Sequence, residues 1–198
     1  MRIRAHGVSK GSALDATTVD APSGEVTLVP IEGGQRPTLL GLILTGRMSP
    51  DAGEVTLDGE DDPRALRRRV ALVDAPDASA PADDLPLRAV VHEELVFAGL
   101  RRPRAATRRL LADEDLSDRA TAPMKALSAG ERVRVLARTA AAHPDVDALV
   151  IVSPDRHGGD IASWLDVARA WASRDFAVIV IASAATVDAA IDREHIAR

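Results

Sequence analysis

The segment Leu127-Ser128-Ala129-Gly130-Glu131-Arg132 most constrains the fold of this chain, because of its position ahead of a helix and a strand. It leads into an arginine-rich helical stretch over residues 133–142, and the apolar run 148–152 comes soon after. Ser128 with Glu131 three residues later is the pattern of a helix N-terminus. At such an end the amides of Ala129 and Gly130 and the helix dipole favour an anion. The order of polar loop, helix and buried strand predicts an α/β fold.

Short apolar runs recur along the chain and alternate with helical patterns, which predicts a mostly parallel, doubly wound sheet flanked by helices. The expected core strands are residues 26–29, 70–73, 149–152 and 178–181, with further strands at 3–8 and 54–57. The expected helices are 39–44, 63–69, 87–100, 104–116, 133–142, 161–174 and 187–191. Residues 74–86 lack periodicity and read as a linker. The whole chain, 1–198, is expected to be one domain, with a small helical subdomain inserted at about 85–140.

Composition excludes several classes of function. The chain has no cysteine, so disulfides, thiolate catalysis and cysteine-ligated zinc are excluded. A net charge of -5 argues against a partner that is a nucleic acid. No apolar run is long enough to span a membrane, and we expect a cytoplasmic protein. Lys10 and Lys125 are the only lysines, so any chemistry that requires a lysine must use one of these two positions.

The region around Ser128 resembles the signature segment of ATP-binding cassette (ABC) ATPases, which usually reads Leu-Ser-Gly-Gly-Gln/Glu before an arginine-rich helix and the Walker B strand. The first half of the chain resembles the same family: a strand, a loop with Gly33 and Gly34, a leucine-rich helix, a Pro-Asp-x-Gly turn and a second strand. The resemblance covers about residues 3–185 and implies a P-loop NTPase-like fold. It also implies that the anion at Ser128 is the γ-phosphate of ATP held by an opposing subunit. The alternative is an ordinary capping box, in which Ser128 only caps its helix.

The resemblance makes the loop before residue 39 a phosphate-binding loop, which in working form reads G-x-x-x-x-G-K-[ST]. Two registers fit. The first, which needs no insertion in the helix and is preferred, places Thr38 at the hydroxyl position, Pro37 at the lysine and Gly34 at the middle glycine. The second places Arg36 at the lysine and Gly33 at the middle glycine. Neither keeps a lysine, and a proline at this junction lacks an amide for phosphate. The predicted nucleotide-binding residues are Gly33, Gly34, Arg36 and Thr38 in a degenerate P-loop, and Ser128, Ala129 and Gly130 in the signature loop.

The family's remaining catalytic positions hold other residues, and no aromatic precedes Phe97 to stack on adenine. Asp155 is the one carboxylate near the strand 149–152, and we expect it to be a turn or helix-cap residue. We therefore predict weak ATP binding, no magnesium site, no catalytic residue and no independent ATPase activity. At four positions where the family has a catalytic residue, this chain has another one: Ser153 or Val152 in place of the magnesium-binding acid, Pro154 or Ser153 in place of the catalytic base, Asp74 or Ala75 in place of a glutamine, and Ala182 or Ser183 in place of a histidine.

These patterns leave three functions open. The leading one is a degenerate ABC-type subunit that works with a membrane-spanning transporter subunit, a homologous ATPase subunit, or both, as a homodimer or heterodimer. Such a chain would be cytoplasmic and peripheral at the membrane through its partner, docking by the cleft beside residues 74–86 and the helix 87–100. The first alternative is a scaffold or regulatory protein that keeps the fold without nucleotide. The second is a small P-loop enzyme, such as a nucleotide kinase, that uses Arg36.

Overall fold

A parallel sheet of four strands forms the centre of the molecule, as the apolar runs predict. The computed structural model describes residues 1–196, with side chains described to residue 192. Its strand order is β3-β7-β6-β5. The strands are β3 (Val26–Pro30), β5 (Val70–Val73), β6 (Ala148–Val152) and β7 (Ala177–Ala182). All neighbouring pairs in this sheet are parallel, so the four predicted core strands and the α/β class are confirmed.

A second, antiparallel sheet lies beside the first and was predicted only in part. It has the order β2-β1-β4, with β1 (Arg2–Lys10), β2 (Leu14–Pro22) and β4 (Ala52–Leu57). The sequence did not predict β2, because its buried residues Leu14, Val19 and Ala21 do not alternate regularly. The pairing of β1 with β2 has two register shifts, and such bulges break the two-residue period on which a strand prediction depends.

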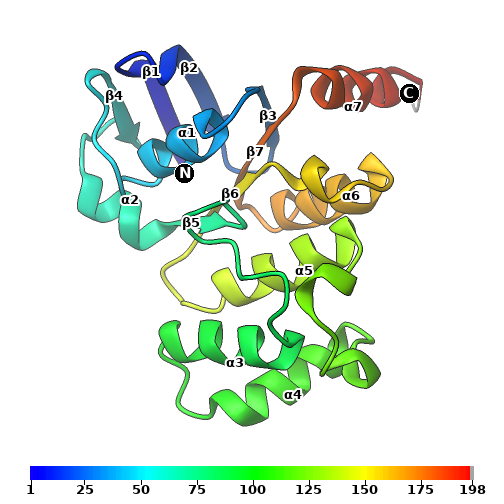
Figure 1. Ribbon diagram of the computed structural model, residues 1–198. Coiled ribbons are helices and arrows are strands. Elements are labelled where there is room, and N and C mark those ends of the chain that lie inside the picture. Colours follow the sequence, from blue (N-terminus) through cyan, green and yellow to red (C-terminus); the bar gives the residue numbers. More distant parts are fainter. Residues whose placement is uncertain (197–198) are drawn as a thin grey trace.

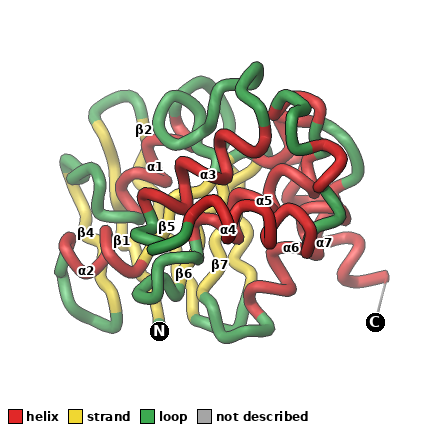
Figure 2. The backbone as a smooth tube through the Cα atoms, turned by 90° about the horizontal axis from the view of Figure 1, so that it is seen from below, coloured by secondary structure: helices red, strands yellow, loops and turns green. Residues whose placement is uncertain are grey.

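Helices cover both sheets and build a separate lobe, which lies at the bottom of Figure 1. We call residues 87–126 the helical lobe. It contains α3 (Leu87–Phe97) and α4 (Pro103–Asp113). Figure 2 views the molecule from the side of the helical lobe and shows these two helices in front of the strands. The last helix begins earlier and runs further than the predicted 187–191, and α1 begins at Arg36 rather than residue 39. The helices are α1 (Arg36–Leu44), α2 (Pro63–Arg69), α3 (Leu87–Phe97), α4 (Pro103–Asp113), α5 (Ala129–Ala140), α6 (Ile161–Ala172) and α7 (Ala184–Ile196), with short 3-10 turns at Ser117–Arg119, Met124–Ala126 and Pro154–His157.

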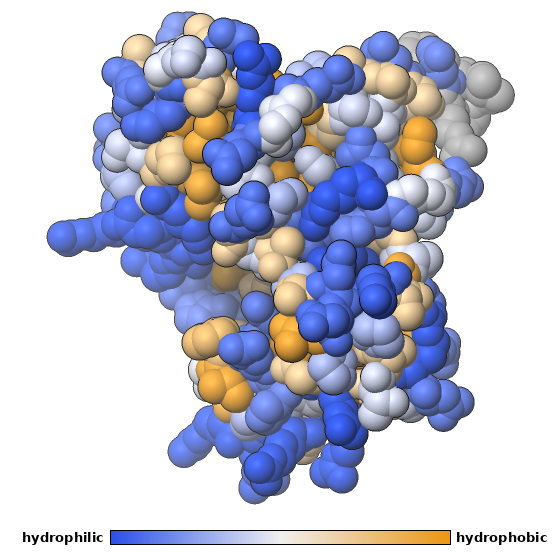
Figure 3. Space-filling model, in the orientation of Figure 1, coloured by the Kyte–Doolittle hydropathy of each residue, from blue (hydrophilic) through white to orange (hydrophobic). Residues whose placement is uncertain are grey.

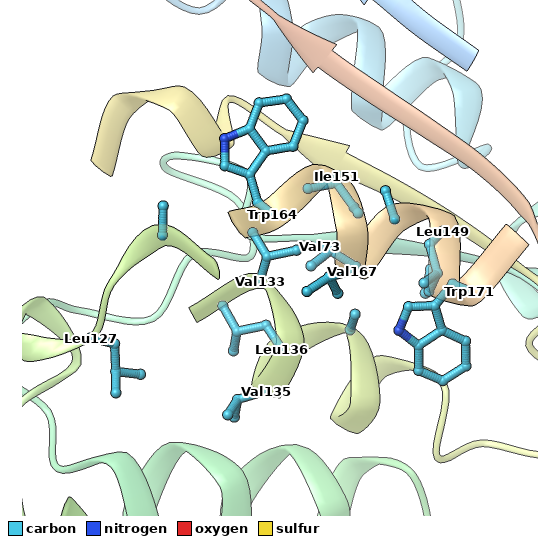
Figure 4. Packing of buried hydrophobic residues seen from close by; sticks show 14 of the residues in the cluster. Val73, Leu127, Val133, Val135, Leu136, Leu149, Ile151, Trp164, Val167 and Trp171 are labelled. Atoms are coloured by element: carbon cyan, nitrogen blue, oxygen red, sulfur yellow. The ribbon is translucent and has the colours of Figure 1, made fainter. Parts of the chain in front are cut away.

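The two faces of the parallel sheet bury two different hydrophobic cores, because successive strand residues point to opposite faces. On one face Val150, Val152 and Ile181 pack with α1 and the antiparallel sheet. On the other face Leu149 and Ile151 pack with α5, α6 and the helical lobe. Figure 4 shows the second core, where Trp164 and Trp171 of α6 lie close to side chains of α5 and the strands. Strands buried on both faces are typical of a parallel sheet covered by helices.

Within the described part of the chain, no helix combines the length and the apolar character that a membrane-spanning helix needs.

Candidate functional site

The carboxyl ends of the parallel strands are where open α/β folds bind their ligands. In this molecule β5 is followed by Asp74, and β6 by the turn that carries Asp155, Arg156 and His157. The loop 31–35 follows β3, and Ser183 follows β7. The residues predicted from the P-loop and Walker B resemblance therefore gather at one edge of the sheet. Their side-chain partners decide what this edge can bind.

A buried ion cluster occupies the ends of β5 and β6. The side chain of Asp74 is fully buried, and Arg132 of α5 donates to both of its carboxylate oxygens from Nε, at 3.1 and 3.0 Å, and from Nη2 at 3.0 Å. Arg156 Nη2 lies 2.9 Å from Asp74 Oδ1, and His157 Nε2 lies 2.9 Å from Oδ2. Arg132 also donates to Asp83 Oδ1 at 3.2 Å. One carboxylate thus holds together the ends of two strands and helix α5.

The backbone and the charges of this cluster support each other. Asp74 has a φ of 55°, a left-handed conformation that aspartate and asparagine tolerate better than most residues. Burial alone would raise the pKa of the Asp74 carboxyl, but hydrogen bonds from His157 and Arg132 and the charge of Arg156 outweigh burial and hold the pKa below its ordinary value. Asp74 is therefore an ionised, fully paired carboxylate in a low-dielectric environment.

Arg156 places a cation where the resemblance would require a metal. Its Nη1 donates to the carbonyls of Val152 and Ser153 at 2.8 and 3.1 Å, so the guanidinium lies directly at the end of β6. In the described residues, no three histidine or acidic side chains are grouped so that they could hold a metal ion. Asp74, the acid nearest to β5, is already engaged by the cluster. The side chains at this edge do not fit a magnesium ion.

A second cluster at the same edge brings two carboxylates to the start of α7. Asp155 Oδ2 accepts from the amide of Ser183 at 3.1 Å and from Thr186 Oγ1 at 3.2 Å. Glu32, from the loop after β3, accepts from the amide of Ala184 at 2.9 Å. Asp155 lies in a 3-10 turn and caps another element, so the prediction of a turn or cap residue is confirmed. These two carboxylates occupy the amide donors that an anion would otherwise use at the N-terminus of α7.

The predicted P-loop residues lie on one loop, but their side chains have partners within the chain. Gly33 and Gly34 have positive φ in an exposed turn, and a Cβ at either would meet nothing within 4 Å. Arg36 is the first residue of α1, and its Nη1 lies 3.8 Å from Asp15 of β2. The hydroxyl of Thr38 is mostly buried and donates to the carbonyl of Pro76 at 3.1 Å. This loop lacks a lysine and lacks the amide of residue 37, so it does not fit the phosphate cradle that the resemblance implies.

The signature loop has the geometry of a complete capping box. Glu131 N donates to Ser128 Oγ at 3.3 Å, and Glu131 Oε2 accepts from Ser128 N at 2.8 Å and from Ser128 Oγ at 2.9 Å. Burial alone would raise the pKa of Glu131, but these bonds and the nearby Arg119 hold it below its ordinary value. Ser128 is exposed, whereas Ala129 and Gly130 are buried. A Cβ on Gly130 would lie 2.7 Å from the carbonyl oxygen of Ser163, so this glycine permits close packing of α5 against α6.

Most residues of the two clusters were not predicted from the sequence as site residues. Asp74 was named only as a replacement for a glutamine, and Arg132 only as part of the signature segment. Their contact joins residues 58 positions apart, and no local pattern reports such a pair. The one available signal was that charged residues follow two strongly apolar strands: Asp74 comes after β5, and Asp155 and Arg156 come after β6. The residues that sequence reasoning missed are Glu32, Asp83, Arg156, His157 and Thr186.

Comparison with known proteins identifies the fold. No protein-family model matches the chain. A solved ATP-binding subunit of an ABC transporter superposes with a TM-score of 0.62 at 21% identity, covering 93% of this chain and 80% of that one. The ATP-binding cassette MJ0796, solved as a post-hydrolysis dimer with ADP and phosphate, gives 0.63 at 18% identity, covering 92% and 88%. The chain has the fold of ABC ATP-binding domains.

Two further proteins, a solved cbiO1 and a curated CbiO, also resemble the chain. The structure of cbiO1 from Clostridium perfringens, described as part of the ABC transporter complex cbiONQ, has a TM-score of 0.64 at 18% identity and covers 91% of this chain and 77% of that one. The cobalt import ATP-binding protein CbiO of Rhodobacter capsulatus is 33% identical over 148 residues. That match covers 68% of this chain and 51% of the relative, so the chain spans about half the length of the curated protein it matches.

A groove of about 340 Å³ lies between one end of the helical lobe and the edge of the sheet. Its lining comes from the end of α1, from α2, from the start of β5 and from the ends of α3 and α5. Phe97 on its rim is 75% exposed. Glu94 faces the groove, and its pKa is raised by burial and by the neighbouring Glu93. The groove therefore combines an exposed apolar side chain at its rim with basic and acidic groups in its lining. Its lining residues are Arg47, Arg67, Arg68, Val70, Ala71, Leu72, Glu94, Phe97, Ala98, Thr139, Ala140, His143 and Val146.

Proposed function

We propose that the chain is a degenerate ABC subunit of a membrane transport assembly, one that does not hydrolyse ATP by itself and binds nucleotide weakly. The observation that carries this proposal is the cluster of Asp74 with Arg132 and Arg156. Phosphoryl transfer depends on a metal, a cation at the transferred phosphate and a positioned base. At the ends of β5 and β6, where the family places the metal and the base, this chain has a closed ion pair.

The carboxylates of Glu32 and Asp155 support the same proposal. A triphosphate carries several negative charges, and it would lie beside these two acids at the start of α7. Like charges that are close together in a partly buried site repel each other and weaken binding. The hydroxyl of Thr38 already donates to the carbonyl of Pro76, and the carboxylate of Asp15, 3.8 Å from Arg36, adds a further negative charge near this loop.

Such a subunit would act through the proteins that it binds. A membrane-spanning subunit would dock in the groove between α2 and the end of α3. A homologous ATPase subunit, in a homodimer or heterodimer, would receive Ser128 and the start of α5 against its own nucleotide. The cbiONQ complex and the post-hydrolysis dimer named above are the precedents for these two kinds of partner.

The proposal predicts the behaviour of the purified chain toward ATP. In a calorimetric titration we expect a Kd of about 1 mM or weaker. The Kd should be the same with and without magnesium, because Arg156 occupies the place of the metal. Phosphate release should not exceed that of a variant with both Ser128→Ala and Arg36→Ala. Magnesium-dependent binding in the micromolar range, or turnover above this background, would show that the proposed function is wrong.

The second candidate is a scaffold that keeps the ABC fold and has no nucleotide role in any partner. It is favoured by one observation: the amide and hydroxyl of Ser128 are already bound by Glu131, which Arg119 contacts at 2.5 Å. On this view Ser128 only caps α5. No comparable observation favours the nucleotide-kinase alternative.

Two substitutions at Ser128 distinguish the composite site from the scaffold. In a complex with an active partner, we expect Ser128→Glu to lower the partner's ATP turnover about tenfold, equivalent to roughly 1.4 kcal/mol. The reason is that a carboxylate would replace a hydrogen-bond donor to the γ-phosphate and add repulsion. Ser128→Asp, which keeps a good capping residue, should change thermal stability little and still lower turnover. If neither variant changes turnover in an assembled complex, the scaffold function replaces the composite site.

A further inference from the structure

The outer side of the helical lobe carries four arginines and one histidine, which we call the cationic face after its arginines: Arg88, His92, Arg102, Arg104 and Arg108. Arg88 and His92 lie four residues apart on α3, and Arg104 and Arg108 lie four apart on α4, so each pair shares one side of its helix. These residues line two shallow grooves of about 660 and 510 Å³. Arg104, Arg108 and His92 belong to both grooves, so the face is continuous.

The arginines of the cationic face are exposed to solvent. Among the described side chains, no carboxylate forms an ion pair with Arg88, Arg102, Arg104 or Arg108. The inner side of α4 differs, because Glu114 there binds arginines of α5. The chain as a whole has a net charge of -5. At physiological ionic strength, however, charges more than about 8 Å away are largely screened, so the local positive charge decides what approaches.

Exposed apolar side chains adjoin the cationic face at the end of α3. Val96 lies four residues after His92 and is 48% exposed, and Phe97 next to it is 75% exposed. In Figure 3 the surface of the helical lobe, at the bottom of the view, is largely hydrophilic with small hydrophobic patches. Arginines beside an exposed phenylalanine and valine are the combination that binds a lipid bilayer at its interface.

We propose that the cationic face, together with Val96 and Phe97, binds the surface of a bilayer that contains anionic phospholipids. Guanidinium groups form paired hydrogen bonds to phosphate oxygens, and the two apolar side chains enter the boundary between headgroups and acyl chains. A single-stranded nucleic acid would instead need several aromatic side chains for its bases to stack on, and this face offers one. The contact goes beyond the proposed function and does not depend on any nucleotide or protein partner.

Sedimentation of the full chain with lipid vesicles tests the proposal. We expect binding to vesicles of phosphatidylcholine mixed with phosphatidylglycerol and none to vesicles of phosphatidylcholine alone. The double variant Arg104→Gln and Arg108→Gln should reduce the partition coefficient about 25-fold, because each arginine near an anionic surface contributes roughly fivefold. Phe97→Ala should weaken binding several-fold at any salt concentration. High salt should weaken binding by the wild-type chain to about the same extent as the arginine double variant does at low salt.

A matched control separates local from total charge. Arg4→Gln with Arg169→Gln also removes two positive charges, from β1 and α6 outside the cationic face, and should leave vesicle binding unchanged. The proposal is overturned if the arginine double variant binds like the wild type, or if phosphatidylcholine alone is bound equally well. It is also overturned if the chain binds no vesicles, or binds a single-stranded oligonucleotide more tightly than the mixed vesicles. Circular dichroism of each variant confirms that these exposed substitutions keep the fold.

Discussion

Replacing the buried carboxylate of Asp74 by an amide, in Asp74→Asn, is expected to lower the free energy of unfolding by about 3–5 kcal/mol. The variant removes the negative charge that balances Arg132, whose side chain is 2% exposed, and Arg156. The buried guanidinium of Arg132 would then lie beside Arg156 and would keep only the exposed carboxylate of Asp83 as an ion partner. Asparagine tolerates the left-handed backbone at this position, so the loss reports charge rather than strain. Urea unfolding followed by tryptophan fluorescence measures it.

The control for Asp74 is Asp83, which contacts the same arginine from a side chain that is 68% exposed. Asp83→Asn should cost about 0–1 kcal/mol, because exposed ion pairs contribute little. Arg132→Met should destabilise the chain as strongly as Asp74→Asn, and the double variant should lose clearly less than the sum of the two. Additive losses, or a loss below about 1 kcal/mol for Asp74→Asn, would mean that the cluster does not hold the molecule together.

The pH dependence of stability gives an independent measure of the same carboxylate. The pKa of Asp74 lies below its ordinary value of 3.8 in the folded state. A carboxyl with a lowered pKa contributes stability above the pKa it has when unfolded, and this contribution disappears as the pH falls through the folded pKa. The difference in stability between the wild type and Asp74→Asn should therefore be full at about pH 5 and above, and should shrink below about pH 4.

Gly130→Ala is expected to lower the free energy of unfolding by about 2–3 kcal/mol in the isolated chain. The added Cβ would lie 2.7 Å from the carbonyl oxygen of Ser163 and 2.9 Å from its carbonyl carbon and Cβ. Two of these are backbone atoms, so α5 and α6 would have to move apart. The better helix propensity of alanine returns at most about 1 kcal/mol.

The neighbouring Ser128→Ala serves as a comparison for Gly130→Ala. It removes the cap of α5 without a clash and should cost about 1 kcal/mol. If Gly130→Ala leaves the isolated chain as stable as the wild type, the glycine is not required for packing. The glycine in the signature loop would then be better explained by close approach to a phosphate held by a partner subunit.

The central sheet was predictable from the sequence because its strands are apolar on both faces. All five residues of β6 are buried, and so are all six of β7, and such runs stand out without any long-range information. The strand β2 was not predictable, since its exposed threonines and aspartates read as a loop. Helix ends also differed by a few residues. Propensity and period do not fix an end unless a cap such as Ser128 marks it.

The candidate site was predictable in place but not in chemistry. The carboxyl ends of the strands could be located, and the replacements at the family's catalytic positions could be counted. The groups that stand there instead depend on pairs such as Asp74 with His157 and Glu32 with Ala184, which are 83 and 152 residues apart. The sequence shows which charged residues are present but not which of them form pairs, because the pairs depend on how the turns after β5, β6 and β7 pack together.

The second hydrophobic core determines how cooperatively the molecule unfolds. It runs without interruption from Val178 and Leu149 in the sheet, through Val133 and Trp164, to Val91 and Leu110 in the helical lobe. A swing of that lobe away from the sheet would expose this apolar surface to water, at roughly 25 cal/mol for each Å² uncovered. The lobe and the sheet therefore form one cooperative unit, in which neither half melts while the other stays native. A variant that loosens the lobe weakens the whole chain.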